Sequence, residues 1–147
     1  MKKIDPIVLK ETGFVALVTL IMSVFMQAIF LIIDNWVPSA WDYRVLIGNL
    51  IGYIASVGNF FLMGLSVQKA LGKEEKDAAN FMKLSQMGRV LLLFLVALGG
   101  YLIDQFVFDT FSAGFIIAII VPYTFPRIAV MLRPLASKLK NRGKKNE

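Results

Sequence analysis

The chain has 147 residues, enough for one domain, and 57% of them are hydrophobic. An ordinary soluble domain contains roughly 45–50% apolar residues, so a water-soluble core of this size has no room for the excess. The sequence contains no cysteine and no histidine, which excludes disulfides, thiolate or imidazole metal ligands, and hydrolase triads built on either residue. The net charge of +6 is a candidate nucleic-acid signal, but the basic residues flank apolar runs, which favours a membrane protein with no nucleic-acid partner.

The first long apolar run, residues 13–33, contains no charged residue. Its 21 residues would span about 31 Å as an α-helix, close to the roughly 30 Å hydrocarbon core of a bilayer. A cleaved signal peptide is the alternative, but the run is much longer than the apolar region of such a peptide, and Pro38 fits a cleavage site poorly. We therefore expect a transmembrane helix over about residues 9–33.

The second uncharged run, residues 45–67, predicts a helix over about residues 45–71. Small residues recur in it at every fourth position, which places them on one helix face where the backbone of another helix can approach closely: Gly48, Gly52 and Ser56. Asn49 and Asn59 lie on or beside that face. Such amides, together with Gln27 of the first run, serve either as interhelical hydrogen-bonding groups or as the lining of a polar path.

Only residues 90–103 of the third run are free of charge, and 14 residues give about 21 Å of helix, which is too short to span a bilayer. Two extensions restore the length. The helix continues through Asp104, or Arg89 lies just inside the membrane and extends its guanidinium to the interface. We expect a helix over about residues 76–108, in which Asp104 is either an interfacial acid in contact with headgroup water or a carboxylate of an ion pathway.

The fourth run predicts a helix over about residues 111–133 and contains Pro122 and Pro126. Each proline lacks a backbone N–H, so the carbonyls of Ala118 and Pro122 lose their usual helical partners. Freed carbonyls either bind a cation beside a cavity or mark a kink that fits the helix to its neighbours. The connection from the third run is short, which predicts that the last two helices form an antiparallel hairpin.

Fifteen of the 16 Lys and Arg residues lie on one side of the four predicted spans, and Arg44 alone lies on the other. Positive residues mark the cytoplasmic side of a membrane protein, so both termini are expected in the cytoplasm. The prediction is an all-α polytopic membrane domain over residues 1–137, built from four transmembrane helices in two antiparallel hairpins, N-in and C-in. Residues 138–147 are expected to form a basic, disordered cytoplasmic tail. Glu11 and Arg127 both fall at the cytoplasmic boundary, where they are candidates for an ion pair.

The residue pattern contains nothing that predicts catalysis. No pair of carboxylates is spaced for acid–base work, no cluster resembles a metal site, and no glycine loop resembles a phosphate cradle. We therefore expect neither an enzyme nor a bound cofactor or metal.

Six short segments, most of them in the second and third helices, carry a recognisable pattern. They are residues 41–49 (WDYRVLIGN), 59–71 (NFFLMGLSVQKAL), 75–78 (EKDA), 82–86 (MKLSQ) with Arg89 after it, 125–128 (FPRI) and 133–135 (RPL). Together they resemble the ATP synthase subunit I family, in order over roughly the last two-thirds of the chain. Segment 59–71 is the most specific, the first helix contributes only hydrophobicity, and residues 104–112 match no pattern of the family.

The resemblance implies a non-catalytic accessory protein of the bacterial cytoplasmic membrane that helps the c-subunit ring of an F-type ATP synthase assemble. The implied partners are membrane-sector subunits, the c subunit foremost, besides the lipid bilayer. The residues expected at such an interface belong to the small-residue face and the family-like cytoplasmic segments: Gly48, Asn49, Gly52, Ser56, Asn59, Gln68, Lys69, Glu75, Asp77, Arg89 and Arg127. The alternative is a small cation channel or Mg²⁺ uptake protein, which needs a homo-oligomer to multiply Asp104 into a ring of acids.

Overall fold

The structure is a computed structural model that describes residues 4–38, 40–108 and 112–143. Every regular element in this part of the chain is helical: α1 (Pro6–Asp34), α2 (Tyr43–Ala70), α3 (Glu75–Val107), α4 (Ala113–Ile120), the 3₁₀ turn η1 (Val121–Thr124) and α5 (Phe125–Gly143). Four helical stretches are long and apolar enough to cross a membrane, namely α1, α2, α3 and Ala113–Pro134, which runs from α4 into α5. The all-α class is confirmed, and the four apolar stretches suggest a multi-pass membrane protein.

Capping residues set the starts of the first two helices. The Asp5 carboxylate accepts a hydrogen bond from the Ile7 backbone N–H at 2.8 Å, and Pro6 occupies the first turn, where its missing N–H costs nothing. Asp42 accepts in the same way from the backbone N–H of Arg44. These caps explain why both helices begin before the positions predicted from the apolar runs.

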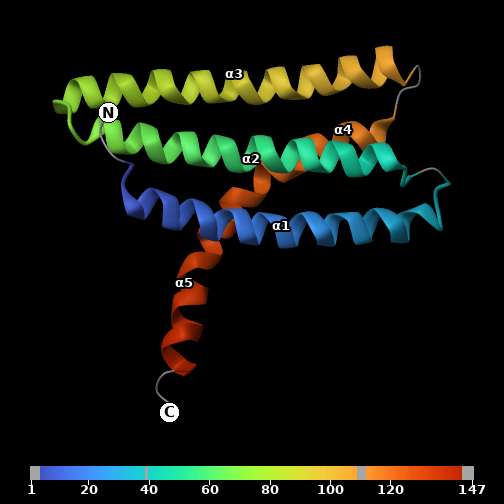
Figure 1. The fold of residues 1–147 in the computed structure, drawn as a ribbon, viewed down its shortest axis with the longest axis horizontal. Coiled ribbons are helices and arrows are strands. Elements are labelled where there is room, and N and C mark those ends of the chain that lie inside the picture. Colours follow the sequence, from blue (N-terminus) through green and yellow to red (C-terminus); the bar gives the residue numbers. More distant parts are fainter. Residues whose placement is uncertain (1–3, 39, 109–111, 144–147) are drawn as a thin grey trace.

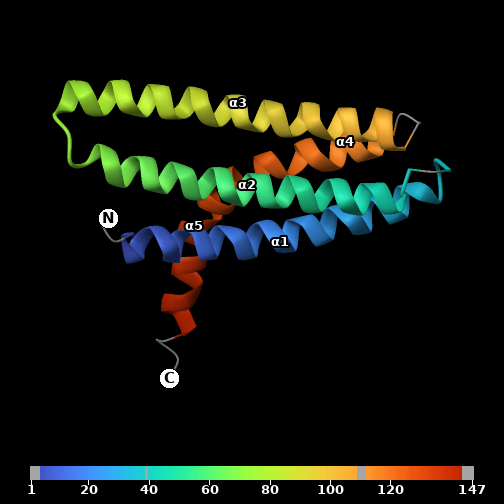
Figure 2. The same ribbon diagram turned by 45° about the horizontal axis from the view of Figure 1, so that its top comes forward.

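α1, α2 and α3 lie side by side as a layer with α2 in the middle (Figures 1 and 2). α4 crosses one face of this layer and packs mainly against α2. Among the described residues, α3 packs against α2 and α4 and makes no packing contact with α1 or α5. The fold is therefore built around α2, whereas α3 is covered on few of its sides.

The fourth membrane-length stretch is not one straight helix. α4 ends at Ile120, η1 follows with Pro122 in its first turn, and α5 then runs steeply away from the layer on the α1 side (Figure 1). Pro122 and Pro126 lack N–H groups that a continuous α-helix needs, so the break at η1 follows from them. This confirms the kink, one of the two roles that the sequence left open for the prolines.

The last helix is longer than predicted. α5 continues to Gly143 with Pro134 inside it, so residues 138–143, which we expected in a disordered tail, are helical. Residues 144–147 of that expected tail lie outside the described residues.

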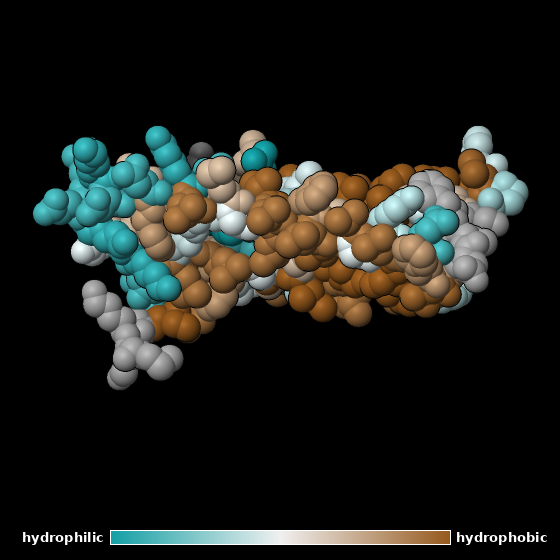
Figure 3. All heavy atoms as spheres, turned by 90° about the horizontal axis from the view of Figure 1, so that it is seen from above, coloured by the Kyte–Doolittle hydropathy of each residue, from teal (hydrophilic) through white to brown (hydrophobic). Residues whose placement is uncertain are grey.

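The buried core is small and the outer surface is apolar. Met26, Val45, Ala118 and Phe125 form the centre of the core, where α1, α2, α4 and α5 meet. Hydrophobic residues cover the middle of the surface seen from the α3 side, and hydrophilic residues gather at the end where α2 connects to α3 (Figure 3). An apolar exterior over a thin core suits helices surrounded by lipid, since lipid chains are as apolar as a leucine side chain.

Candidate functional site

The small-residue face of α2 is covered by the chain's own fourth stretch. A Cβ atom added at Gly48 would lie 2.7 Å from the carbonyl oxygen of Phe115, and one at Gly52 would lie 2.5 Å from that of Ile119. Both contacts are with backbone, so α4 approaches α2 at a separation that requires glycine. The close helix approach predicted for this face is confirmed. The face is not open to lipid, however, as a surface for a second protein would have to be.

Ser56 continues this face and hydrogen-bonds to the kink. Its hydroxyl donates to the carbonyl oxygen of Pro122 at 2.8 Å, and the backbone N–H of Phe125 donates to the same oxygen. This is the carbonyl that Pro126 leaves without its α-helical donor. Because the oxygen already accepts two hydrogen bonds, it has no free lone pair for a cation, and the proline kink is a packing feature.

Two of the amides singled out in the sequence join α1 to α2. The side chain of Asn49 donates to the Ser23 carbonyl at 3.1 Å, and that of Gln27 donates to the Val45 carbonyl at 3.3 Å. Interhelical hydrogen bonding is therefore the observed use of both. The Oδ1 atoms of Asn49 and Asn59 are both buried without a partner in the described part of the chain.

Asp104 is fully buried, so it is not an interfacial acid in contact with headgroup water. Its Oδ2 accepts a hydrogen bond from the backbone N–H of Ser112 at 2.6 Å, and its Oδ1 lies 3.5 Å from Nη1 of Arg44. Arg44 also pairs with Asp42 at 2.6 Å and lies over the ring of Phe108. A carboxylate held between a fixed cation and a helix N-terminus has its charge compensated within the chain, which disfavours a role as an ion-pathway ligand.

Arg44 organises the end of the molecule where α1 connects to α2. Burial by itself raises the pKa of the Asp42 carboxyl, but hydrogen bonds from the side chain and backbone of Arg44, together with its charge, hold that pKa below its usual value. Asp104 stands out in the sequence, but its pairing with Arg44 was not predicted. The signal was present, because Arg44 is the single basic residue on its side of the predicted spans.

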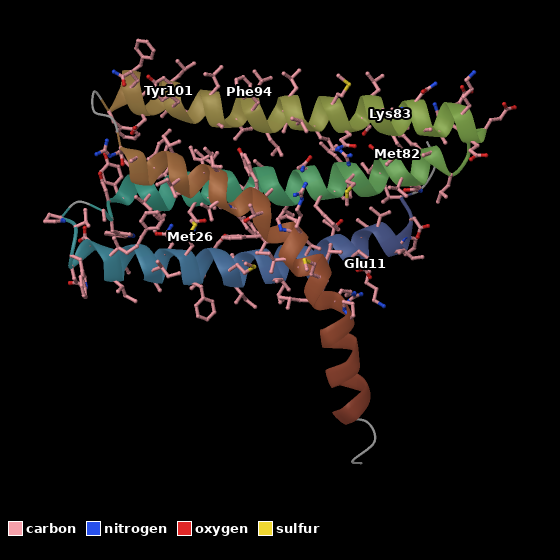
Figure 4. The ribbon with its side chains drawn as sticks, turned by 180° about the vertical axis from the view of Figure 1, so that it is seen from behind. Glu11, Met26, Met82, Lys83, Phe94 and Tyr101 are labelled. Atoms are coloured by element: carbon pink, nitrogen blue, oxygen red, sulfur yellow. The ribbon has the colours of Figure 1, made fainter. Side chains whose placement is uncertain are left out.

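Arg133 attaches α5 to α1 near the opposite end. Its guanidinium pairs with Glu11 and lies 4.5 Å from the ring centre of Phe14; Figure 4 shows Glu11 on α1 beside α5. The predicted partner of Glu11 was Arg127, which is exposed instead. The reason is the direction of α5: it leaves the layer across α1, so the residue that reaches Glu11 lies more than one turn beyond Arg127.

The cytoplasmic candidates of the sequence analysis fall at the α2–α3 end. Lys69, Glu75 and Asp77 are exposed, and hydrophilic residues gather at this end of the molecule in Figure 3. Gln68 has a partner within the chain, because its Oε1 accepts a hydrogen bond from the Asp5 backbone N–H at 3.2 Å. Three of these four side chains are therefore accessible to a partner.

Arg89 on α3 is half-buried, and its Nη1 is buried without a hydrogen-bond partner among the described residues. Arg89 forms no ion pair with the described residues.

The face of α3 that turns away from α2 is open and apolar. Leu84, Met87, Leu91 and Phe94 are each more than half exposed and line a shallow groove of about 960 Å³. Figure 4 shows Lys83 and Phe94 along the length of this helix. The sequence analysis missed this face, although its residues recur at intervals of three and four, the spacing of one helix face.

No group of three or more potential metal-ligating side chains occurs within the described ranges. Comparison with known proteins finds no matching family model, no similar curated protein and no similar solved structure. Functional inference therefore depends on the residues of this chain.

Proposed function

We propose that this chain is a non-catalytic accessory factor of a bacterial F-type ATP synthase that helps c subunits assemble into their ring in the membrane. It holds an apolar transmembrane helix of the c subunit against its own α3 until that helix passes to the ring. The observation that carries the proposal is the open face of α3 formed by Leu84, Met87, Leu91 and Phe94. The link to the ATP synthase comes from the family-like segments, above all residues 59–71.

The packing of the four stretches explains why α3 is the docking helix. Helices in lipid associate through close packing rather than through the hydrophobic effect. A partner helix therefore needs a helix face that is not already packed against another helix. α2 is covered by α1, α3 and α4, which all pack against it. Among the described residues, α3, with 33 residues and a length of about 50 Å, packs its backbone against α2 and α4 and otherwise accepts one hydrogen bond from Tyr123 of η1. We therefore place the interface on α3. The sequence had led us to expect it on the small-residue face of α2.

The proposal includes an orientation: four crossings in two antiparallel hairpins, with both termini in the cytoplasm. The positions of 15 of the 16 basic residues support it, because positive residues stay on the cytoplasmic side. In this orientation Lys69, Glu75 and Asp77 project into the cytoplasm beside the open face of α3. A c-subunit loop could contact them there while its helices lie along α3.

The test is site-specific photo-crosslinking in cells that express the chain with its own ATP synthase. A photoreactive amino acid at Leu91 is expected to crosslink to c subunit. The matched control is Phe25, which is as exposed and as apolar but belongs to α1, at the opposite edge of the layer from α3. Crosslinking to c subunit from Leu91 and not from Phe25 supports the proposal.

Two outcomes would contradict it. Equal yields of c subunit from Leu91 and Phe25 would mean collision in a crowded membrane, and products containing only lipid from Leu91 would mean that no protein docks on α3. A deletion strain that assembles c rings at the normal rate would also count against the function.

The alternative of a homo-oligomeric Mg²⁺ or other cation channel is not favoured by any feature of the described residues. It depended on Asp104 as a free acid, and the oxygens of Asp104 contact Ser112 and Arg44. The mass of the purified chain in detergent distinguishes the two functions, because the channel requires an oligomer and the accessory factor does not.

A further inference from the structure

The cytoplasmic half of α2 and α3 has an uncovered face. α4 and η1 cover α2 along Gly48, Gly52 and Ser56, and beyond this point α5 turns toward α1 (Figures 1 and 4). Within the described part of the chain, α5 makes no packing contact with α3. The face that α4 protects in the outer half is therefore left without a helix in the cytoplasmic half.

Two unsatisfied polar groups lie between α2 and α3 in this half of the molecule, on the helix sides that carry Ser66 and Ser85. Nη1 of Arg89 and Oδ1 of Asn59 are both buried and without hydrogen-bond partners among the described residues. A hydrogen bond of 2.5 Å between Ser66 and Ser85 fixes the register of α2 against α3. From that bond, Asn59 lies two turns and Arg89 one turn farther from the α2–α3 connection, so the two side chains are at neighbouring levels.

The bond between the Tyr123 hydroxyl and the Leu93 carbonyl, at 3.4 Å, places η1 beside α3 one turn beyond Arg89. Arg89 therefore lies just below the point where the covering helix departs. Nη1 itself is enclosed, but the residue as a whole is only half-buried, so part of the side chain is accessible.

The chemistry of an unpaired arginine specifies an anion. Its guanidinium cannot lose its proton in a protein, and a buried charge without a counter-charge is strongly unfavourable. The planar fork of N–H groups matches the oxygens of a phosphate. Arg89 also directly precedes the uncharged run of residues 90–103, which puts it at the level where lipid phosphates lie.

We propose that Arg89, with Asn59 beside it, binds the phosphate of an anionic phospholipid headgroup in the cytoplasmic leaflet. The oxygen and nitrogen of an Asn side chain are assigned from their hydrogen bonds, and turning the Asn59 amide over brings Nδ2 to the place of the unpartnered Oδ1, as a second donor to the phosphate. The apolar surface after Arg89 accommodates the acyl chains. This inference goes beyond the proposed accessory function and rests on that proposal only for the orientation of the chain in the membrane.

The experiment is native mass spectrometry of the full chain in neutral detergent, titrated with phosphatidylglycerol or with phosphatidylcholine. We expect one phosphatidylglycerol to bind preferentially, and Arg89→Gln to weaken its binding by about tenfold or more, the range for a lost hydrogen bond to a charged group. Lys83→Gln removes the same charge from an exposed side chain of the same helix and should leave the preference unchanged.

Thermal unfolding separates lipid binding from a structural role of Arg89. In neutral detergent without lipid, Arg89→Gln should unfold at the same temperature as the parent chain or higher, because an unpaired charge has been removed. Added phosphatidylglycerol should raise the unfolding temperature of the parent chain and not that of Arg89→Gln. A large loss of stability without lipid would show that Arg89 has a partner in the protein and would overturn the proposal.

Three further results would also overturn it. Equal loss of lipid binding in Arg89→Gln and Lys83→Gln would indicate attraction by overall charge alone. Equal binding of the two lipids would remove the requirement for an anion. Stabilisation of the parent chain by inorganic phosphate to the same extent as by phosphatidylglycerol would identify a soluble anion as the ligand.

Discussion

Gly52 is a residue at which the close backbone contact between α2 and α4 can be tested. We predict that Gly52→Ala destabilises the protein by about 1–3 kcal/mol, because the new Cβ would lie 2.5 Å from the Ile119 carbonyl and forces α4 away from α2. The measurement is thermal unfolding in detergent, followed by circular dichroism.

Gly58 on the same helix provides the control. A Cβ added there meets nothing within 4 Å, so Gly58→Ala should be neutral or should stabilise the helix by up to about 1 kcal/mol. If the two alanines have the same effect, the packing of α4 on α2 is not as described.

Asp104 is the second residue whose role the structure defines sharply. Asp104→Ala removes the acceptor for the Ser112 N–H and one counter-charge of Arg44, and we predict a loss of about 2–4 kcal/mol. Asp104→Asn keeps an oxygen for the Ser112 N–H, so its loss should be smaller. Unfolding of both variants in detergent gives the comparison. Equal losses would mean that the hydrogen bond to Ser112 contributes nothing.

At the scale of elements, the kink between α4 and α5 is stabilised by a side chain from α2. We predict that Ser56→Ala lowers the free energy of unfolding by about 1 kcal/mol, because the Pro122 carbonyl keeps only one of its two donors. Thr124→Ala is the control, since the Thr124 hydroxyl is exposed and bonds only within its own turn, to Val121. The same unfolding assay applies, and a larger effect at Thr124 would contradict the assignment.

The four helical stretches could be predicted from hydropathy, and the prolines marked where the last one breaks, but several helix ends and the partners of the helices could not be predicted. Gly48, Gly52 and Ser56 indicate that some helix comes close to α2, and nothing in their spacing says that the helix is α4 of the same chain. Lipid-facing and helix-facing positions have the same apolar character in a membrane, so hydropathy does not distinguish them.

The polar contacts were harder to predict for a related reason. Arg44 and Asp104 meet only when α2, α3 and α4 are assembled, and Arg133 reaches Glu11 only because the kink turns α5 toward α1. The apolar face of α3 is open because no helix of the described residues packs there. Residue spacing can show that a face is apolar, but it does not show whether another helix covers it. The candidate site could therefore be predicted from the sequence less well than the helices, because its contacts form only when the helices are assembled.

For the whole molecule, the proposed orientation makes a direct prediction. The chain has no cysteine, so single cysteines can be introduced and labelled without background. Val37→Cys in the α1–α2 connection should react with a membrane-impermeant maleimide added outside intact cells. Lys73→Cys at the α2–α3 end should react only after the membrane is permeabilised. Both positions are exposed in the structure. The reverse labelling pattern would invert the orientation.

The departure of α5 across α1 gives the molecule two unequal flanks. α5 has 19 residues and a length of about 28 Å, and it extends beyond the layer on the α1 side. A neighbour sliding in the plane of the bilayer meets this helix when it arrives from the α1 flank, whereas the α3 flank is unobstructed. Two copies would therefore not crowd symmetrically around a third protein. A partner protein therefore approaches more easily from the α3 side, because the two prolines turn the last helix toward α1.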